Sequence, residues 1–295
     1  MFGRRPDGKT VGMHVDPITR LTPYIMTERV DAQVASEQYI DSEILSDYIR
    51  KKKAEGLRIT HMELVIAAFV RVVSQMPHFN RFVVGKKLYA RNELTVSFAM
   101  LKERSARHIV ETTLKIHFDP SDTIYDVSRR VSSEIEKNRS IEAKNNTDKL
   151  VNVLLSIPGL LSIVVGFLKM LDRIGWLPKS IIDVSPFHSS LFVTNMGSIK
   201  MGHVFHHIYN FGTTSYFFGI GRRVARVLLS HDGKVSAKNY YPIGIVNDER
   251  IAPGGSQSLG LTLFNSLLKK PERLEQPPEE VFFDIGLKYH QPKPE

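Results

Sequence analysis

The chain has 295 residues, of which 42% are hydrophobic and 24% are charged, as in a globular protein that buries a substantial core. It contains no cysteine, which excludes disulfide bonds, thiolate metal sites and cysteine nucleophiles. The formal net charge of +9 is compatible with a solvated basic surface, a site for an anionic cofactor or a nucleic-acid surface. The basic runs are scattered and no nucleic-acid-binding motif accompanies them, so we expect no nucleic-acid partner.

The two ends of the chain differ in composition from its middle. Residues 1–20 are polar, contain Gly and Pro, and predict an arm without a core of its own. They include no apolar segment of the secretory type, so a cytoplasmic location is expected. We expect one domain over residues 21–275 and a Pro-rich tail over residues 276–295.

The first predicted elements are a strand over 24–39 and a helix over 40–55, which Ser42 could cap. The strongest helix prediction covers 60–74. Thr60 and Glu63 form a capping box there, and apolar residues occupy nearly every side of the helix. This helix is therefore expected to be buried.

Short strands are predicted next, at 81–84, 87–89, 94–100 and 108–116, followed by an amphipathic helix over 123–138. The last third alternates strands and turns, with strands at 190–194, 215–219, 224–230 and 237–246 and a closing helix at 259–268. This order of elements predicts a mixed α/β sandwich rather than a doubly wound parallel sheet.

Residues 150–168 form an apolar stretch without a single charge. Its length makes it a candidate membrane span, but Pro158 and Gly159 divide it and three polar residues lie within it. Three interpretations follow: two buried or subunit-facing helices, peripheral contact with a membrane surface, or a true span.

Three segments together resemble the acyltransferase catalytic domain of 2-oxoacid dehydrogenase complexes and its relative chloramphenicol acetyltransferase. Residues 62–89 resemble the family's long buried helix, its Pro-x-x-Asn turn and a strand hairpin. Residues 191–221 are similar to the Ser-Asn-x-Gly strand and the glycine-ended strand that follows it. Residues 232–274 run without a gap against the segment that carries the catalytic Asp-His-Arg-x-x-Asp-Gly motif. The resemblance covers most of residues 24–275, apart from an apparent insertion near 145–185.

The resemblance implies an α/β fold of the chloramphenicol acetyltransferase type, a sandwich with a central mixed β-sheet flanked by helices. It also implies a homotrimer or a multiple of trimers, with each active site between two subunits. Coenzyme A, as acyl-CoA, would enter from one side and a small-molecule acyl acceptor or donor from the other. No Asp-Lys-Ala lipoyl turn is found, so a lipoylated partner would have to be another polypeptide.

Acyl transfer needs a base for the attacking nucleophile and donors for the oxyanion of the tetrahedral intermediate. In the family, the motif histidine is the base and the Ser-Asn-x-Gly hydroxyl is a donor. Thr194 keeps this hydroxyl, followed by Asn195 and Gly197; alternatively it is a strand threonine bonded to nearby backbone. Of the catalytic motif, Asp248, Arg250 and Gly254 are retained.

Two positions of the catalytic motif depart from the family. Glu249 stands in place of the histidine, and Pro253 replaces an aspartate that in the family pairs with an arginine. The reference pKa of a Glu carboxyl is about 4.3, against about 6.5 for histidine, so deprotonating a thiol would require an environment that raises it. Glu249 could be a working base, it could be a structural or surface residue of a degenerate site, or the base could come from elsewhere.

The candidates for a base from elsewhere are histidines: His188, His203, His206 and His207. In a strand, which the neighbouring residues favour, His203 and His207 would share a face. Ordinary packed or exposed histidines and a metal site with helical spacing are the alternatives, and we expect no metal. Three functions remain: an acyl-CoA-dependent acyltransferase with an altered base, a catalytically inactive trimeric scaffold or binding protein, and a membrane-peripheral protein that acts on a lipid or polyketide acyl group.

Overall fold

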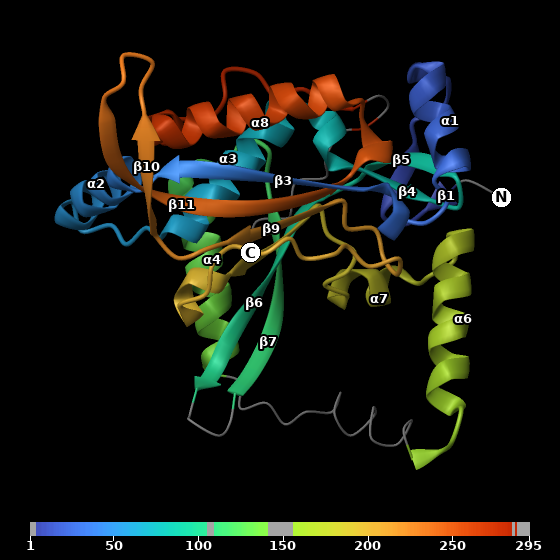
Figure 1. Cartoon of the computed structure of the whole chain (residues 1–295). Coiled ribbons are helices and arrows are strands. Elements are labelled where there is room, and N and C mark those ends of the chain that lie inside the picture. Colours follow the sequence, from blue (N-terminus) through green and yellow to red (C-terminus); the bar gives the residue numbers. More distant parts are fainter. Residues whose placement is uncertain (1–3, 105–108, 141–155, 285–286, 288–295) are drawn as a thin grey trace.

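The computed structural model describes residues 4–104, 109–140, 156–284 and 287. A seven-stranded mixed sheet forms the framework, with helices packed on one face (Figure 1). Its order is β10 (Val224–Leu229), β11 (Val235–Asp248), β9 (Tyr216–Ile220), β8 (Leu191–Asn195), β6 (Leu94–Arg104) and β7 (Ile109–Phe118), and β3 (Gln33–Asp41) pairs with β11. Only the β6–β8 and β8–β9 pairs are parallel. The predicted mixed α/β sandwich is confirmed.

A second, four-stranded antiparallel sheet joins the chain's beginning to its middle. Its order is β1 (Arg4–Arg5), β2 (Gly8–Thr10), β5 (Lys87–Arg91) and β4 (Arg81–Val84). The strand predicted over 24–39 starts later than expected, because α1 (Pro17–Ile25) forms first: Asp16 accepts a hydrogen bond from the backbone of Thr19, and Pro17 opens the helix.

The helices α2 (Ser42–Ala54), α3 (His61–Gln75), α4 (Ile124–Ser140) and α8 (Gly254–Lys269) cover one face of the large sheet (Figure 1). The predicted capping box of α3 is confirmed, since the side chains of Thr60 and Glu63 and the two backbone N–H groups bond reciprocally. Ser42 was expected as the cap of α2, but Asp41 caps it, with its carboxylate accepting from the backbone of Glu43.

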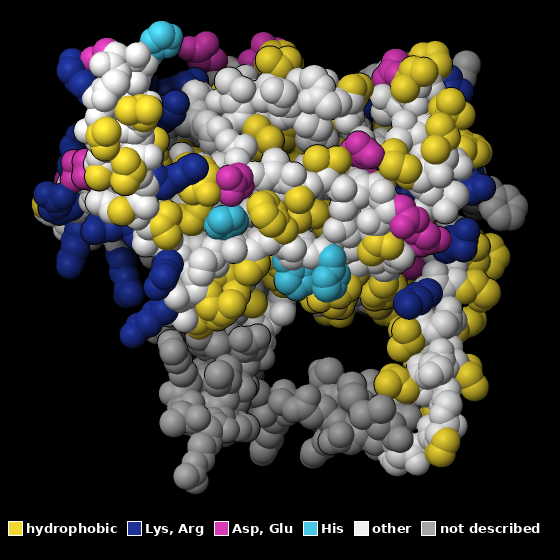
Figure 2. Space-filling model, viewed as in Figure 1, with side chains coloured by type: hydrophobic (Ala, Val, Ile, Leu, Met, Phe, Trp, Pro, Cys, Tyr) yellow, Lys and Arg dark blue, Asp and Glu magenta, His cyan; other side chains and the backbone are white. Residues whose placement is uncertain are grey.

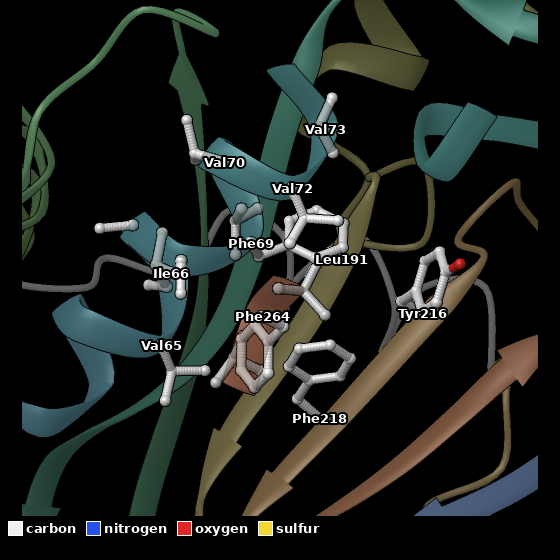
Figure 3. Packing of buried hydrophobic residues seen from close by; sticks show 14 of the residues in the cluster. Val65, Ile66, Phe69, Val70, Val72, Val73, Leu191, Tyr216, Phe218 and Phe264 are labelled. Carbon is white, nitrogen blue, oxygen red and sulfur yellow. The ribbon is translucent and has the colours of Figure 1, made fainter. Parts of the chain in front are cut away.

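The core lies between α3 and the sheet. Figure 3 shows Phe69 of α3 close to Phe218 of β9, with Phe264 of α8 beside them, and all three are at most 2% exposed. Their rings meet edge to face at centroid distances of 5.5–5.8 Å. α3 is buried on nearly every side, so the buried helix predicted from its all-round apolar pattern is confirmed.

The segment after α8, as far as Asp284, packs on the body. Arg81 of β4 pairs with Asp284 through two hydrogen bonds of 2.5 and 2.8 Å, and the N–H of Phe282 donates to the carbonyl of Ser74. The closing helix α8 begins at Gly254, five residues before the predicted start. The limits predicted for arm, domain and tail stay predictions.

The apolar stretch predicted over 150–168 is described only from residue 156. One helix, α6 (Leu160–Ile174), begins directly after Pro158 and Gly159, and α7 (Lys179–Val184) follows it. α6 stands at one edge of the molecule and is largely exposed in this chain (Figure 1). No helix among the described residues is long and apolar enough to cross a membrane.

Candidate functional site

Thr194 lies at the end of β8, where the chain leaves the sheet. Its half-buried hydroxyl lies 3.5 Å from the sulfur of Met196. Asn195 caps the following 3₁₀ turn η4 (Met196–Ile199) by accepting from the backbone of Ser198. A Cβ on Gly197 would come within 3.0 Å of a backbone oxygen, so this turn passes close to the end of β9. Asn195 and Gly197 thus shape the turn that presents the Thr194 hydroxyl.

Asp248 ends β11 and is fully buried. Its carboxylate accepts from the Arg250 guanidinium at 2.7 and 2.8 Å and from the Arg250 backbone, and lies 3.5 Å from Arg29 Nε. Arg29, also buried, donates further bonds to three carbonyl groups, those of Val83, Tyr209 and Gly212. Arg250 reaches the carbonyls of Met26 and Thr27. One carboxylate and two guanidiniums therefore hold the loop of residues 248–254, which carries the catalytic motif and is called the motif loop below.

This network shows how the loop keeps its shape without the motif aspartate. Pro253 occupies that position and precedes the first turn of α8, which begins at Gly254. Its φ of −59° suits proline, but it offers no carboxylate to a guanidinium. Asp248 instead is the partner of the buried Arg29.

Glu249 lies in the 3₁₀ turn η5 (Glu249–Ile251), between Asp248 and Arg250 in the chain, and it is exposed. Within the described part of the chain its carboxylate makes no hydrogen bond or ion pair. It borders a cavity of about 350 Å³ between β3 and α8 and is the cavity's one charged residue. The other lining residues are Val34, Ser36, Gln38, Asn247, Gly254, Gln257, Ser258, Leu261, Thr262 and Asn265. The exposed lining is more apolar than polar, with amides, hydroxyls and one carboxylate among it, which suits an uncharged molecule or a cationic one that has an apolar part.

A single chain does not bring Thr194 and Glu249 together. Thr194 pairs with Gly219, and Gly219 pairs with Gly244, which places all three at one level across the sheet. Glu249 follows Gly244 by five residues along β11, which is about 16 Å at the rise of an extended strand. The two groups therefore lie toward opposite ends of the sheet and cannot act on one carbonyl carbon within one chain.

Of the alternative bases, His203 lies on the sheet face to which Thr194 also points. The chain crosses the sheet face here: a Cβ on Gly219 or Gly244 would come within 2.6 or 2.3 Å of the Val204 carbonyl oxygen. Directly paired residues point to the same face, so Thr194 and His203 share this side, about 10 Å apart at two strand spacings. His203 Nε2 lies 3.3 Å from a carboxylate oxygen of Glu37, a pairing that orients an imidazole.

The other histidines pack against neighbours. The His206 ring stacks on Phe217 at 4.2 Å, and His207 stacks on His206 at 4.6 Å. The strand predicted for this region is wrong, since residues 201–209 cross the sheet without joining it. Figure 2 shows histidines gathered in the middle of this face. Among the described residues, no group of three His, Asp or Glu side chains is placed to hold a metal ion.

His188 is 1% exposed and belongs to a buried polar cluster. Its Nδ1 lies 2.8 Å from the Ser185 hydroxyl and its Nε2 lies 3.3 Å from Asp172, which also pairs with Arg5. Burial lowers the pKa of His188, which Asp172 partly offsets. Although burial alone would raise it, the pKa of the Asp172 carboxyl falls to about 2 through its hydrogen bond to His188 and the charge of Arg5. This cluster ties α6 to the body and faces neither Thr194 nor Glu249.

The architecture is that of the chloramphenicol acetyltransferase-like acyltransferases. A probable dihydrolipoamide acetyltransferase from Listeria monocytogenes superposes with a TM-score of 0.55 at 13% identity, over 91% of this chain and 97% of that chain. The cubic core of a pyruvate dehydrogenase multienzyme complex gives 0.55 at 14% identity, over 88% and 93%. A chloramphenicol acetyltransferase gives 0.51 at 9% identity, over 88% and 99%.

These solved structures confirm the predicted resemblance at the level of the fold, which is all that such low identities show. No protein-family model matches the sequence, and no curated protein matches it either.

Proposed function

We propose that this chain is an acyltransferase that moves an acyl group between coenzyme A and a thiol, alcohol or amine acceptor, in a site shared by two copies. The observation that carries the proposal is the separation of Thr194 and Glu249 along the sheet. Each group lies toward its own end of the sheet, so a neighbouring copy would have to supply the second half of the apparatus. The multienzyme core among the similar structures supports an assembly of this kind, and we propose a trimer or a multiple of trimers.

In the proposed reaction, the acceptor's nucleophilic atom attacks the thioester carbonyl of acyl-CoA while Glu249 takes its proton. The hydroxyl of Thr194 from the adjacent copy donates a hydrogen bond to the oxyanion. Collapse of the tetrahedral intermediate breaks the carbon–sulfur bond, and the protonated Glu249 returns its proton to the departing coenzyme A thiolate. The adjacent copy, packed over this end of the sheet, would also shield Glu249 from water, which favours its use as a base.

The cavity beside Glu249 would hold the acceptor. Its largely apolar lining, with amides, hydroxyls and one carboxylate, fits an uncharged or cationic acceptor with an apolar part better than an anionic one. If the base comes from elsewhere, His203 is the candidate, because it shares the sheet face with Thr194 and is paired with Glu37. A cytoplasmic location is part of the proposal.

A catalytically inactive scaffold is the second candidate. It is favoured by one observation: the network of Asp248, Arg29 and Arg250 is complete without any contribution from Glu249. The loop would keep its shape even if no proton were transferred there. Under this hypothesis, changes at Glu249 leave every function of the protein intact.

The test follows release of free thiol from several acyl-CoAs with thiol, alcohol and amine acceptors. Glu249→Gln and Thr194→Ala should each abolish turnover and leave the melting temperature unchanged, while Thr194→Ser retains activity. Co-expression of the two inactive variants should then restore about a quarter of the sites in a randomly mixed trimer, since each site draws one group from each of two chains. His203→Gln is the control for the alternative base.

Absence of turnover by the wild-type protein with all acceptors would support the scaffold instead. Loss in both single variants without recovery in the mixture would place the two groups in one chain, contrary to the proposal. Loss in His203→Gln with full activity in Glu249→Gln would assign the proton transfer to His203.

A further inference from the structure

Helix α6 exposes apolar side chains to solvent, the reverse of the usual arrangement for a helix on the surface of a globular protein. Of its fifteen residues, only Asp172 is buried. Besides Val165, which lies on another side of the helix, four large apolar side chains are exposed by 37–70%: Ile163, Phe167, Met170 and Ile174. Their spacing of i, i+4, i+7 and i+11 places them in one stripe, on the side of the helix opposite Asp172. The stripe therefore points away from the body of the protein.

Helix α1 has the same inversion. It buries only Thr19 and Pro23, whereas Ile18, Leu21 and Ile25 are exposed by 51–72%. Figure 2 shows hydrophobic side chains along both helices at one edge of the molecule. Two neighbouring helices that expose apolar stripes together form a surface larger than scattered exposed residues would give.

Cationic side chains border these stripes. Arg173 borders the α6 stripe, and Lys169 lies further round the helix toward Asp172; both line a cavity of about 290 Å³ with Lys86, between α6 and the β4–β5 turn. Arg20 of α1 is exposed as well. The acidic residues of the cavity are Glu28, which is exposed, and Asp172, whose charge is balanced by Arg5 at 2.7 Å. The rim is therefore basic beside an apolar stripe.

Trp176 follows α6 directly and is 65% exposed. Tryptophan prefers the boundary between hydrocarbon and water, where its ring is apolar and its N–H stays hydrated. It is the only tryptophan of the chain. An exposed Trp, an apolar stripe and flanking Lys and Arg together are typical of a helix that lies in a membrane interface.

We propose that α6, Trp176 and the outer side of α1 form an anchor for an anionic phospholipid surface. The stripe of Ile163, Phe167, Met170 and Ile174 would enter the boundary between headgroups and acyl chains. Lys169 and Arg173 would lie against lipid phosphates, and the basic cavity that they border would accept a headgroup. At fifteen residues, about 22 Å, α6 is too short to cross the hydrocarbon core of about 30 Å, so the contact is superficial.

A two-fold contact with a second copy of the chain would cover the stripe less well, whereas a heterologous contact, as in the proposed trimer, is tested by the sedimentation measurement below. In a two-fold contact the same surface meets itself, so Lys169 and Arg173 would face their own counterparts across the interface. Like charges brought together in this way cost free energy. Anionic lipid instead meets the same cations with phosphate groups.

The full-length wild-type protein carries its own reporter. Trp176 emission should shift to shorter wavelength with vesicles of phosphatidylcholine and phosphatidylglycerol, and brominated acyl chains should quench it. Vesicles of phosphatidylcholine alone should have little effect, and added salt should weaken the response because exposed charges are screened. Unchanged emission and recovery of the protein in the supernatant with anionic vesicles would overturn the proposal.

Two pairs of variants separate the apolar and charged contributions. Phe167→Glu should lower the vesicle-bound fraction at least about tenfold, whereas Leu259→Glu, at a residue 64% exposed on α8, should not. The double change Lys169→Glu and Arg173→Glu should weaken partitioning at least about 25-fold, from about fivefold per cation. Its control, Lys269→Glu with Lys270→Glu, changes the net charge equally at the exposed end of α8 and should bind normally.

Each variant's melting temperature is measured, so that a loss of binding in a folded protein counts and a loss from unfolding does not. Equal losses in the Lys269 and Lys270 control would reduce the effect to net charge and overturn the assignment to this edge. If Phe167→Glu instead lowers the molecular mass in sedimentation velocity without any lipid, the stripe is an interface between copies.

Discussion

Asp248→Asn is the sharpest test of how the motif loop is held. The substitution keeps the shape of the side chain and removes its charge. It leaves Arg29 and Arg250 buried, 4% and 2% exposed, beside a neutral amide. The amide oxygen can accept only part of the hydrogen bonds that the carboxylate now accepts from Arg250. Two buried guanidiniums without a counter-charge should destabilise the folded state strongly.

The size of the effect follows from the burial of this group. Removing one partner of a buried ion pair costs about 3–5 kcal/mol of unfolding free energy. The unfolding entropy of a chain of this length is about 0.6 kcal/mol per kelvin, from about 2.1 cal/mol per kelvin per residue. Asp248→Asn should therefore lower the melting temperature by about 5–8 °C.

The neighbouring residue supplies a matched control. Glu249→Gln is also an isosteric loss of one negative charge, one position along, but at an exposed carboxylate without a side-chain partner in the described residues. It should change the unfolding free energy by less than about 0.5 kcal/mol. Circular dichroism melts at one protein concentration compare the two. Equal and small shifts in both variants would refute the view that the buried Asp248 holds the loop.

Other predictions concern packing and pH. Gly260→Ala would put a Cβ 1.9 Å from the Phe79 ring and should lower the unfolding free energy by about 2–3 kcal/mol. Gly255→Ala, in the same helix but with open space around it, should be neutral or stabilising by up to about 1 kcal/mol. Urea unfolding measures both changes. Burial, helped by the charge of Arg81, lowers the pKa of His78 to about 4, so the folded state favours its neutral form. The corresponding stability is present above pH 6.5 and should be lost as the pH falls toward 4, by about 2–3 kcal/mol in the wild-type protein and much less in His78→Asn. Equal pH dependence in both proteins would contradict this account.

The regular elements could be predicted where local chemistry and burial agree. The helix α3 carries both its capping box and its all-round apolar pattern in sequence, and both are found in the structure. The helix α1 was not predicted, because residues 1–20 were expected to form a polar arm. Ile18, Leu21 and Ile25 do recur at helical spacing, but they are exposed and Pro23 interrupts this short pattern. The sequence does carry two start signals for this helix, the N-cap Asp16 and the first-turn Pro17.

The site could be predicted only in part, for a physical reason. A motif identifies Thr194 and Glu249, but nothing along the chain gives the pairing of Asp248 with Arg29, which depends on how distant segments pack. The same holds for His203: its place over Gly219 and Gly244 follows from a crossing of the sheet that periodicity does not encode. The sequence does reflect this close approach, since Gly219 and Gly244 are both glycines at which a Cβ would collide with Val204.

The two proposals meet at one edge of the protein. Arg250 holds the Asp248 loop and also donates to the carbonyls of Met26 and Thr27, directly after α1, while its side chain borders the basic cavity beside α6. A lipid surface on α1 and α6 would therefore restrain the segments to which the Glu249 loop is bonded, without touching Glu249 itself. Because lipid contact needs neither Thr194 nor Glu249, vesicle binding by Glu249→Gln should equal that of the wild-type protein. Binding and turnover can thus fail separately, which keeps the anchor and the chemistry independent hypotheses.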